Sequence, residues 1–506
     1  MKSPVEQFDA VVIGSGFGGA MAAHRLVRAG WRVALVERGG WTARDEQDWD
    51  PETILLRHRY RTGSPLLVRQ YGARRFTRVP APALVGGQSV LYGGASMRLR
   101  TTDFQHWPLP YAEMEPWYSR AERLLGVHGD AGTDPCEPPR CAPYPGDPVD
   151  LSPPAARIFL AAEQSGFRPF RLPLAINFHD PARALCIRCN TCDGFPCRIG
   201  AKNDLAVVVL EALHPDGLEI RDHTIVRDLI VQHGRVTETR CVNALDGTTS
   251  RLAGKVTILA AGALHSPAIL QRSDLQGIPR QDLIGRFLMR HCNAVAAYVF
   301  PFRTNPQAVF HKQVCLTDLY ETVRAEWGTA VGVIQDIYTP SPKVLRHAAA
   351  TGFKLAAGLV AGHLQNLLCI AEDEPRYENR VSLAAEQDRY GIPLTTVEHE
   401  YGPRDTERCN MLLRAARTVL RRAGGLIPYT YRIDTFSHAV GTLRMGTDPQ
   451  DSVVDTAGRV HGFDNLFVTD ASVLPASGGV NPSLTIAANA LRVAEHIATE
   501  FRPKGS

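Results

Sequence analysis

The chain has 506 residues, of which 44% are hydrophobic and 21% charged, a composition typical of folded globular proteins and not of disordered or collagenous chains. The 56 basic and 52 acidic residues leave a net charge of only +4, which does not favour nucleic acid or an anionic membrane as a partner. The first residues lack the charged head and apolar core of a signal peptide, and no apolar run reaches the roughly 18 residues of a membrane span. We therefore expect a soluble, cytoplasmic protein with no membrane insertion.

The N-terminal part of the chain predicts a βαβ unit that begins a parallel sheet. Two short apolar runs, at residues 8–13 and 31–37, flank a segment of helical periodicity at residues 16–29. Comparable strands are expected at residues 255–260 and 466–470. Because all of them have the apolar character of buried parallel strands, we expect them to lie in one sheet although they are far apart in the sequence.

Three glycines in the spacing G-x-G-x-x-G, namely Gly14, Gly16 and Gly19, lie between the first strand and the helix. They would allow a tight turn and a close approach of the backbone to a pyrophosphate at the helix N-terminus. Glu37 ends the second strand, where a carboxylate accepts hydrogen bonds from a ribose diol. The pattern predicts dinucleotide binding, although the glycines alone would also fit a tight turn without a ligand.

A second glycine-rich run lies between residues 86 and 94. Small residues there would let backbone amides lie against a second length of an extended cofactor, which favours FAD over NAD. The alternative is a glycine loop that binds nothing.

The remaining segments predict an insertion into this first domain. Residues 132–154 are rich in Pro, Gly, Asp and Cys, which suits a surface connection, and strand-like stretches and a helix at 404–422 follow. The fold class predicted is α/β, with a Rossmann-like, parallel-sheet domain and a second α+β substrate domain whose sheet is mainly antiparallel. The expected ranges are 1–131, 197–292 and 434–506 for the discontinuous cofactor domain, 132–196 for a Cys/Pro-rich excursion, and 293–433 for the substrate domain.

Several ordered motifs extend over nearly the whole chain. They read VVIGSGFGGAMAAHRL, LVERG, VGGQSVLYGGASMR, W-P-x-x-Y-x-x-M-x-P-W-Y, ILAAGALHSPAIL, GRFLMRH, SHAVGTLRMG and DASVLPASGGVNPSLTIAANAL. In this order they resemble the glucose-methanol-choline (GMC) oxidoreductases, a family of FAD enzymes. The resemblance implies FAD as cofactor. It also implies non-covalent attachment, because no histidine lies between Leu84 and Arg100, where some members attach the flavin covalently.

The same resemblance implies cofactor contacts beyond the first glycine motif. They are expected at Gly86, Gly87, Ser89, Tyr92, Gly93, Gly94, Val226, Ala261, Asp470, Ala471, Asn481 and Pro482. Tyr92 stands where many members have asparagine.

The family's active site maps onto His438, in the H-x-x-G-T motif, and onto Asn481. Oxidation of an alcohol requires loss of the hydroxyl proton and transfer of the carbon-bound hydride. A neutral imidazole at His438 suits the first task. The amide of Asn481 can hydrogen-bond the substrate oxygen and hold the C–H bond towards the flavin N5.

The function that follows is FAD-dependent oxidation of a CH–OH group to a carbonyl. The expected partners are a small-molecule alcohol and either oxygen or another electron acceptor. Sugars, aminocyclitols or amino sugars and secondary-metabolite alcohols are the candidate substrates, and an excess of arginine over lysine, typical of a GC-rich bacterial genome, mildly favours a biosynthetic oxidation of a sugar-like intermediate. The alternatives are a hydroxynitrile-lyase-type FAD protein and a non-catalytic FAD-binding subunit. The intact catalytic pair argues against the non-catalytic subunit.

Four cysteines cluster in the spacing C-x2-C-x2-C-x4-C, at Cys186, Cys189, Cys192 and Cys197. This density of thiols would suit a four-thiolate iron–sulfur site, as in some dehydrogenases that resemble this family, and would make the chain a flavin dehydrogenase subunit donating electrons to a protein acceptor. The favoured interpretation is a compact loop whose thiols pack near the flavin or form a local disulfide, with no metal site assigned.

Overall fold

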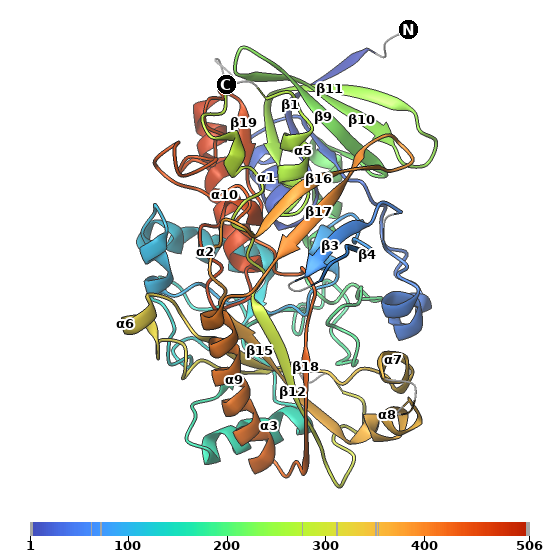
Figure 1. The fold of residues 1–506 in the computed structure, drawn as a ribbon, viewed down its shortest axis with the longest axis vertical. Helices are drawn as coiled ribbons and strands as arrows, with labels where there is room; N and C mark the ends of the chain where they lie inside the picture. The colour runs from blue at the N-terminus through green and yellow to red at the C-terminus, as the bar shows by residue number, and fades with distance from the viewer. Residues whose placement is uncertain are drawn as a thin grey trace.

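The computed structural model describes residues 4–61, 63–70, 73–275, 277–309, 312–349, 352 and 354–501. A seven-stranded sheet lies at one end of the elongated molecule and a six-stranded sheet towards the other, with a four-stranded sheet between them (Figure 1). In the part of the chain with described structure, no helix is both long and apolar enough to cross a membrane.

The seven-stranded sheet has the order β8-β2-β1-β11-β10-β9, with β19 paired to β11. Its strands are β1 (Val5–Ile13), β2 (Val33–Val36), β8 (Leu218–Arg221), β9 (Thr224–Gln232), β10 (Arg235–Asn243), β11 (Thr249–Leu259) and β19 (Leu466–Val468). The pairs β1–β2, β1–β11, β2–β8 and β11–β19 are parallel, and β9 and β10 add an antiparallel edge. The four segments predicted to share one parallel sheet therefore do so.

Three helices lie on or beside this sheet: α1 (Phe17–Val27), which packs against β1 and β2, and then α2 (Tyr111–Leu125) and α10 (Ser483–Glu500). The α10 helix packs against both α1 and α2, and it is apolar on most of its surface because it is buried on most sides. Residues 484–488 are all buried, so the N-terminal turn of α10 lies within the core.

The six-stranded sheet is antiparallel throughout, in the order β18-β12-β15-β14-β13-β6. Its strands are β18 (Ile427–Arg432), β12 (Cys292–Val299), β15 (Leu364–Ala371), β14 (Gly332–Ile337), β13 (Val314–Leu316) and β6 (Phe170–Arg171). Helices α9 (Pro403–Arg422) and α3 (Pro153–Gln164) cover one face, where Ile334 and Cys369 belong to their core. Along the same strands, Val333 and Ile370 point to the opposite face and join the main core. Helix α9 agrees with the helix predicted at residues 404–422, and the sheet agrees with the mainly antiparallel second sheet that was predicted.

A four-stranded sheet in the order β16-β17-β3-β4 was not predicted. Its strands are β3 (Leu66–Gln70), β4 (Thr77–Val79), β16 (Arg380–Gln387) and β17 (Pro393–His399). The parallel pair β3–β17 joins the expected cofactor and substrate ranges, and pairing over such a distance leaves no local signature in the sequence. The domain boundaries given above stay a prediction.

The remaining elements are short. They are β5 (Val127–His128), β7 (Leu174–Ala175), α4 (Glu211–Leu213), α5 (Ser266–Gln271), α6 (Arg324–Trp327), α7 (Pro342–Ala348) and α8 (Lys354–Val360), besides several single turns of 3-10 and π helix. Residues 132–152 form neither helix nor strand, which agrees with the predicted connection.

Candidate active site

The first glycine motif forms the turn between β1 and α1. Gly14 has a φ of 103°, and a Cβ atom on Gly19 would collide with the carbonyl oxygen of Gly14, so these two positions require glycine for internal reasons. Gly16 differs, because it caps α1 without a side-chain hydrogen bond and a Cβ atom there would meet nothing within 4 Å. The structure therefore leaves open space above the N-terminus of α1, the place where a pyrophosphate would lie.

Glu37 lies beside this turn and is 7% exposed. Its Oε2 accepts hydrogen bonds from the backbone nitrogen (3.2 Å) and the Oγ (2.7 Å) of Ser15, and its Oε1 accepts one from the backbone nitrogen of Gly39 at 3.0 Å. The Oγ of Ser15 also accepts a hydrogen bond from the backbone nitrogen of Gly86 at 3.0 Å. Ser15 thus links two groups to the first glycine turn: the carboxylate of Glu37, which is expected to bind a ribose diol, and the second glycine run.

The second glycine run packs directly on the first, since a Cβ atom on Gly87 would lie 2.8 Å from the Cα atom of Gly16. Ser89 is fully buried, and its Oγ donates to the carbonyl oxygen of Gly86 at 2.6 Å. The Tyr92 ring lies edge-on to Phe17, with 5.4 Å between ring centroids. Both side chains therefore hold the run in place, and what the run presents to a cofactor is mainly its backbone.

The end of this run contacts two further segments. Gly93 faces Asp193 of the cysteine loop, and the carbonyl oxygen of Gly94 accepts a hydrogen bond from the backbone nitrogen of Ala175 at 2.8 Å. The Oγ of Ser483, the first residue of α10, donates to the carbonyl oxygen of Ala95 at 3.2 Å. Pro482 precedes α10 at the N-cap position, so the chain leaves Asn481 beside the second glycine run.

Asp470 connects the ILAAGA turn to the C-terminal motif. Its Oδ2 accepts hydrogen bonds from the backbone nitrogen of Gly262 (2.8 Å) and the Oγ of Ser266 (2.5 Å), and that Oγ also accepts from the backbone nitrogen of Ala261 at 3.0 Å. The carbonyl oxygen of Ala471 accepts from the backbone nitrogen of Gly441 at 3.1 Å. Asp470 and Ala471 therefore link the sheet to the loop that carries His438.

Val226, the remaining predicted cofactor contact, lies near the start of β9 and is 5% exposed. Its carbonyl oxygen accepts a hydrogen bond from the Nη2 of Arg272 at 2.7 Å, so this oxygen already has a partner. Two residues earlier, the backbone nitrogen of Thr224 donates to the carbonyl oxygen of Glu37 at 2.8 Å, which places the start of β9 beside the end of β2.

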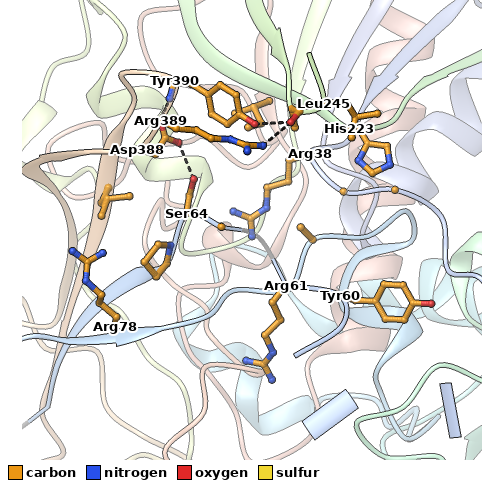
Figure 2. Close-up of a pocket in the computed structure, with 18 of the residues that line it drawn as sticks. Arg38, Tyr60, Arg61, Ser64, Arg78, His223, Leu245, Asp388, Arg389 and Tyr390 are labelled. Atoms are coloured by element: carbon orange, nitrogen blue, oxygen red, sulfur yellow. Dashed lines mark hydrogen bonds between the residues drawn. The ribbon is translucent and has the colours of Figure 1, made fainter. Parts of the chain in front are cut away.

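A cavity of about 560 Å³ opens where these two strand ends meet (Figure 2). Arg38, Gly39 and His223 contribute to its wall, and residues 386–390 close the far side. Five arginines line it, namely Arg38, Arg59, Arg61, Arg78 and Arg389, against the carboxylates of Glu386 and Asp388. The cavity thus lies next to Glu37, beyond the predicted dinucleotide-binding turn, and has an excess of positive charge.

His438 is half-buried in the loop that follows β18, and its Nδ1 lies 2.9 Å from the Nδ1 of His291. Burial, together with proximity to His291 and the charge of Lys312, holds the pKa of His438 well below the ordinary value of 6.5. Its Nε2 makes no hydrogen bond to any residue of the described ranges. The structure therefore presents a neutral imidazole with one nitrogen free.

Asn481 is 8% exposed, and its Oδ1 accepts a hydrogen bond from the Nε2 of Gln335, on β14, at 2.7 Å. This bond assigns the amide oxygen to Gln335, so the Nδ2 group, which has no partner within the described residues, remains available as a donor. The loop before Asn481 contacts His291 through the carbonyl oxygen of Gly478, 2.8 Å from the His291 Nε2. His291 therefore bonds directly to His438 and to the loop that precedes Asn481, whereas the Asn481 side chain itself is held by Gln335.

Sequence reasoning did not assign roles to two members of this group. His291 ends the quoted GRFLMRH motif, so the motif contained a signal that was not used. Gln335 is one polar residue in an otherwise ordinary strand and gave no signal.

The four clustered cysteines lie on one loop against the second glycine run, where the Nζ of Lys202 donates to the carbonyl oxygens of Tyr92 (2.7 Å) and Cys192 (3.1 Å). A hydrogen bond from Cys192 lowers the pKa of Cys189 to about 6, whereas burial raises the pKa of Cys186 to about 11. All four thiols are free of disulfides, and in the described ranges they form no group of three that could hold a metal ion. The arrangement of these four thiols does not fit a four-thiolate cluster.

Comparison with known proteins identifies the family of the chain. Residues 8–293 and 375–490 match the family described as GMC oxidoreductase. The chain is 33% identical to the 6'''-hydroxyparomomycin C oxidase of Streptomyces lividus and 32% identical to the paromamine 6'-oxidase of Streptomyces fradiae, in each case over 98% of this chain and 92% of the relative. The fold matches that of the pyridoxine 4-oxidase from Mesorbium loti with a TM-score of 0.70, over 97% of this chain and 99% of the other, at 22% identity. The chain therefore belongs to the GMC oxidoreductases, flavin enzymes that oxidise alcohols.

Proposed function

We propose that the protein binds FAD non-covalently and oxidises a CH–OH group of an amino sugar or aminocyclitol to a carbonyl. The observation that carries the proposal is a neutral imidazole at His438 held by His291, together with a free amide donor at Asn481 that is held by Gln335. The substrate class is supported by the two relatives above, whose names place them on aminocyclitol compounds.

The residues present fit FAD. Gly16 leaves open space at the N-terminus of α1 for the pyrophosphate, and Glu37 lies at the end of β2 for the ribose diol. The arginine-lined cavity beyond Glu37 is of a size suited to the adenosine end. The second glycine run, whose backbone lies on the first, would face the other half of the cofactor. When bound there, FAD would supply the acceptor for the substrate's hydride.

The side chains of Asn481 and His438 would bind the substrate hydroxyl group and remove its proton. The Nδ2 group of Asn481 would donate a hydrogen bond to the substrate oxygen, and Gln335 keeps the amide in that orientation. The free Nε2 of His438 would accept the hydroxyl proton as the C–H bond breaks. A site shaped by the apolar face of the six-stranded sheet would limit competing water.

The pH dependence follows from the pKa of His438. Protonation would remove the base, and because burial, proximity to His291 and the charge of Lys312 hold the pKa of His438 well below 6.5, the imidazole is neutral throughout the neutral pH range. We therefore expect the acid limb of kcat/KM, measured with an alcohol substrate, to lie below pH 6.5. An acid limb at or above this value would contradict the assignment of His438 as the base.

The cysteine loop yields a separate prediction. Since its thiols form no group of three that could hold a metal ion, we expect protein purified without oxygen to contain FAD but iron and acid-labile sulfide far below a stoichiometric amount. Stoichiometric iron and sulfide would instead support the iron–sulfur dehydrogenase alternative and a protein electron acceptor.

The substrate class is tested by anaerobic titration with paromamine and with simple alcohols of similar size as controls. We expect paromamine to bleach the flavin at lower concentrations than the controls. Equal or better bleaching by simple alcohols would contradict the amino-sugar assignment while leaving the alcohol oxidation itself in place.

A further inference from the structure

His291 is a buried histidine whose backbone conformation is unusual. It is 0% exposed and has a φ of 63°, in the left-handed region that residues other than glycine rarely adopt. Its backbone nitrogen donates to the Oδ1 of Asp373 at 3.2 Å, and its carbonyl oxygen accepts from the hydroxyl of Tyr401 at 2.7 Å. Strained backbone of this kind persists only where its surroundings hold it, and it is concentrated at functional sites.

The two ring nitrogens of His291 have different partners, which identifies its tautomer. The Nε2 lies 2.8 Å from the carbonyl oxygen of Gly478 and 3.3 Å from that of Ser477, and carbonyl oxygens only accept, so the Nε2 carries a hydrogen. Burial lowers the pKa of His291 and keeps the ring neutral, which leaves a lone pair on its Nδ1. The hydrogen between the two Nδ1 atoms, 2.9 Å apart, therefore belongs to His438.

We propose that His291 is a positioning residue that fixes His438 as its Nδ1–H tautomer, so that the lone pair of His438 is on the Nε2 that faces the substrate. The inference deepens the proposed function and rests on it for its kinetic consequences. After the Nε2 takes the substrate proton, the same Nδ1–H bond to His291 would stabilise the imidazolium. The other tautomer would carry a hydrogen on the Nε2 and could not act as the base.

The charged surroundings are compatible with this arrangement. His291 faces Asp373 and His438, and His438 faces His291 and Lys312. The Asp373 carboxylate is held by His399, whose Nε2 lies 3.0 Å from its Oδ2, and Lys312 is paired with Asp193 at 2.6 Å. Neither carboxylate therefore competes with His291 for the hydrogen of His438.

A purely structural role must be distinguished, because the Nε2 of His291 also anchors the loop before Asn481 through Gly478. Two amide variants separate the functions. In His291→Asn the short side chain places an amide oxygen near the original Nδ1, which keeps the acceptor for His438, and asparagine tolerates a positive φ. In His291→Gln the amide reaches the original Nε2, which keeps the contact to Gly478 but leaves no group at the Nδ1 position.

The first test is the rate of anaerobic flavin reduction by the alcohol in both FAD-loaded variants. We expect the limiting rate of His291→Asn to stay within about threefold of wild type. That of His291→Gln should fall about 10- to 100-fold with little change in KM, because loss of the correct tautomer removes a part of the rate enhancement that the base supplies. Wild-type rates in His291→Gln, or loss in His291→Asn alone, would overturn the proposal in favour of loop anchoring.

The second test needs neither substrate nor a stable variant at this strained position. Ring-¹⁵N-labelled wild-type holoenzyme is compared with His438→Gln to identify the His438 signals by NMR. We expect hydrogen on the Nδ1 and none on the Nε2, and hydrogen on the Nε2 would refute the proposal. If no alcohol reduces the flavin, the proposed function fails, yet this spectrum still decides the tautomer.

Discussion

Replacement of His438 by alanine is expected to lower the rate of flavin reduction by the alcohol about 10²- to 10⁴-fold and to leave FAD bound, the range typical for loss of a general base. The expectation rests on the free Nε2 of a neutral imidazole that His291 holds through its other ring nitrogen. The measurement is stopped-flow absorbance of the bound flavin without oxygen, together with the flavin content of the purified variant.

A matched control for this variant is His461→Ala. His461 is also half-buried with a lowered pKa, but its Nε2 lies 2.9 Å from the Oγ of Ser452, on a loop outside the proposed site. We expect this control to keep the wild-type rate. Retention of full activity in His438→Ala would remove the base from the account.

The second large effect is expected for Gly16→Ala, which should weaken FAD binding about 5- to 150-fold, the equivalent of the roughly 1–3 kcal/mol that overpacking costs. Because the added Cβ atom meets nothing within 4 Å and Gly16 has an ordinary φ of −70°, the fold should not change. The methyl group would instead occupy the space above α1 that we assign to the pyrophosphate. Titration of the apoprotein with FAD, followed by flavin fluorescence, gives the Kd.

Two other glycines make this result interpretable. A Cβ atom on Gly352, which is exposed, also meets nothing within 4 Å, so Gly352→Ala should bind FAD as wild type does. Gly19→Ala, in contrast, places the Cβ atom against the carbonyl oxygen of Gly14 and should impair folding itself. Wild-type FAD affinity in Gly16→Ala would contradict the location of the cofactor.

Local sequence patterns predicted the parts of the fold that depend on periodicity. The βαβ unit, the later parallel strands and helix α9 each have a run of apolar residues with a clear period, and the structure confirms them. The pairing of β3 with β17 was missed because it depends on contacts between distant segments and not on either strand alone. Turn chemistry was equally informative at Gly14, where the positive φ explains the residue.

The site was predicted less completely than the fold. Motifs located His438 and Asn481, but the partners that orient them, His291 and Gln335, are identified only by hydrogen bonds across the core. The cofactor contact at Ser89 stays a prediction, and the structure adds that its side chain bonds to its own loop. The spacing of the cysteines left an iron–sulfur cluster open as an alternative. Spacing cannot report the burial and mutual hydrogen bonding that set the pKa values of these thiols, because both depend on the tertiary structure.

The most direct test of the central claim is the visible spectrum of the purified protein during anaerobic addition of amino-sugar alcohols. The account predicts a two-band flavin spectrum that is released on denaturation, that bleaches with substrate, and that yields one carbonyl product per flavin reduced. A flavin that stays oxidised with every alcohol tested, while a cyanohydrin is cleaved, would contradict the oxidation and support the lyase alternative.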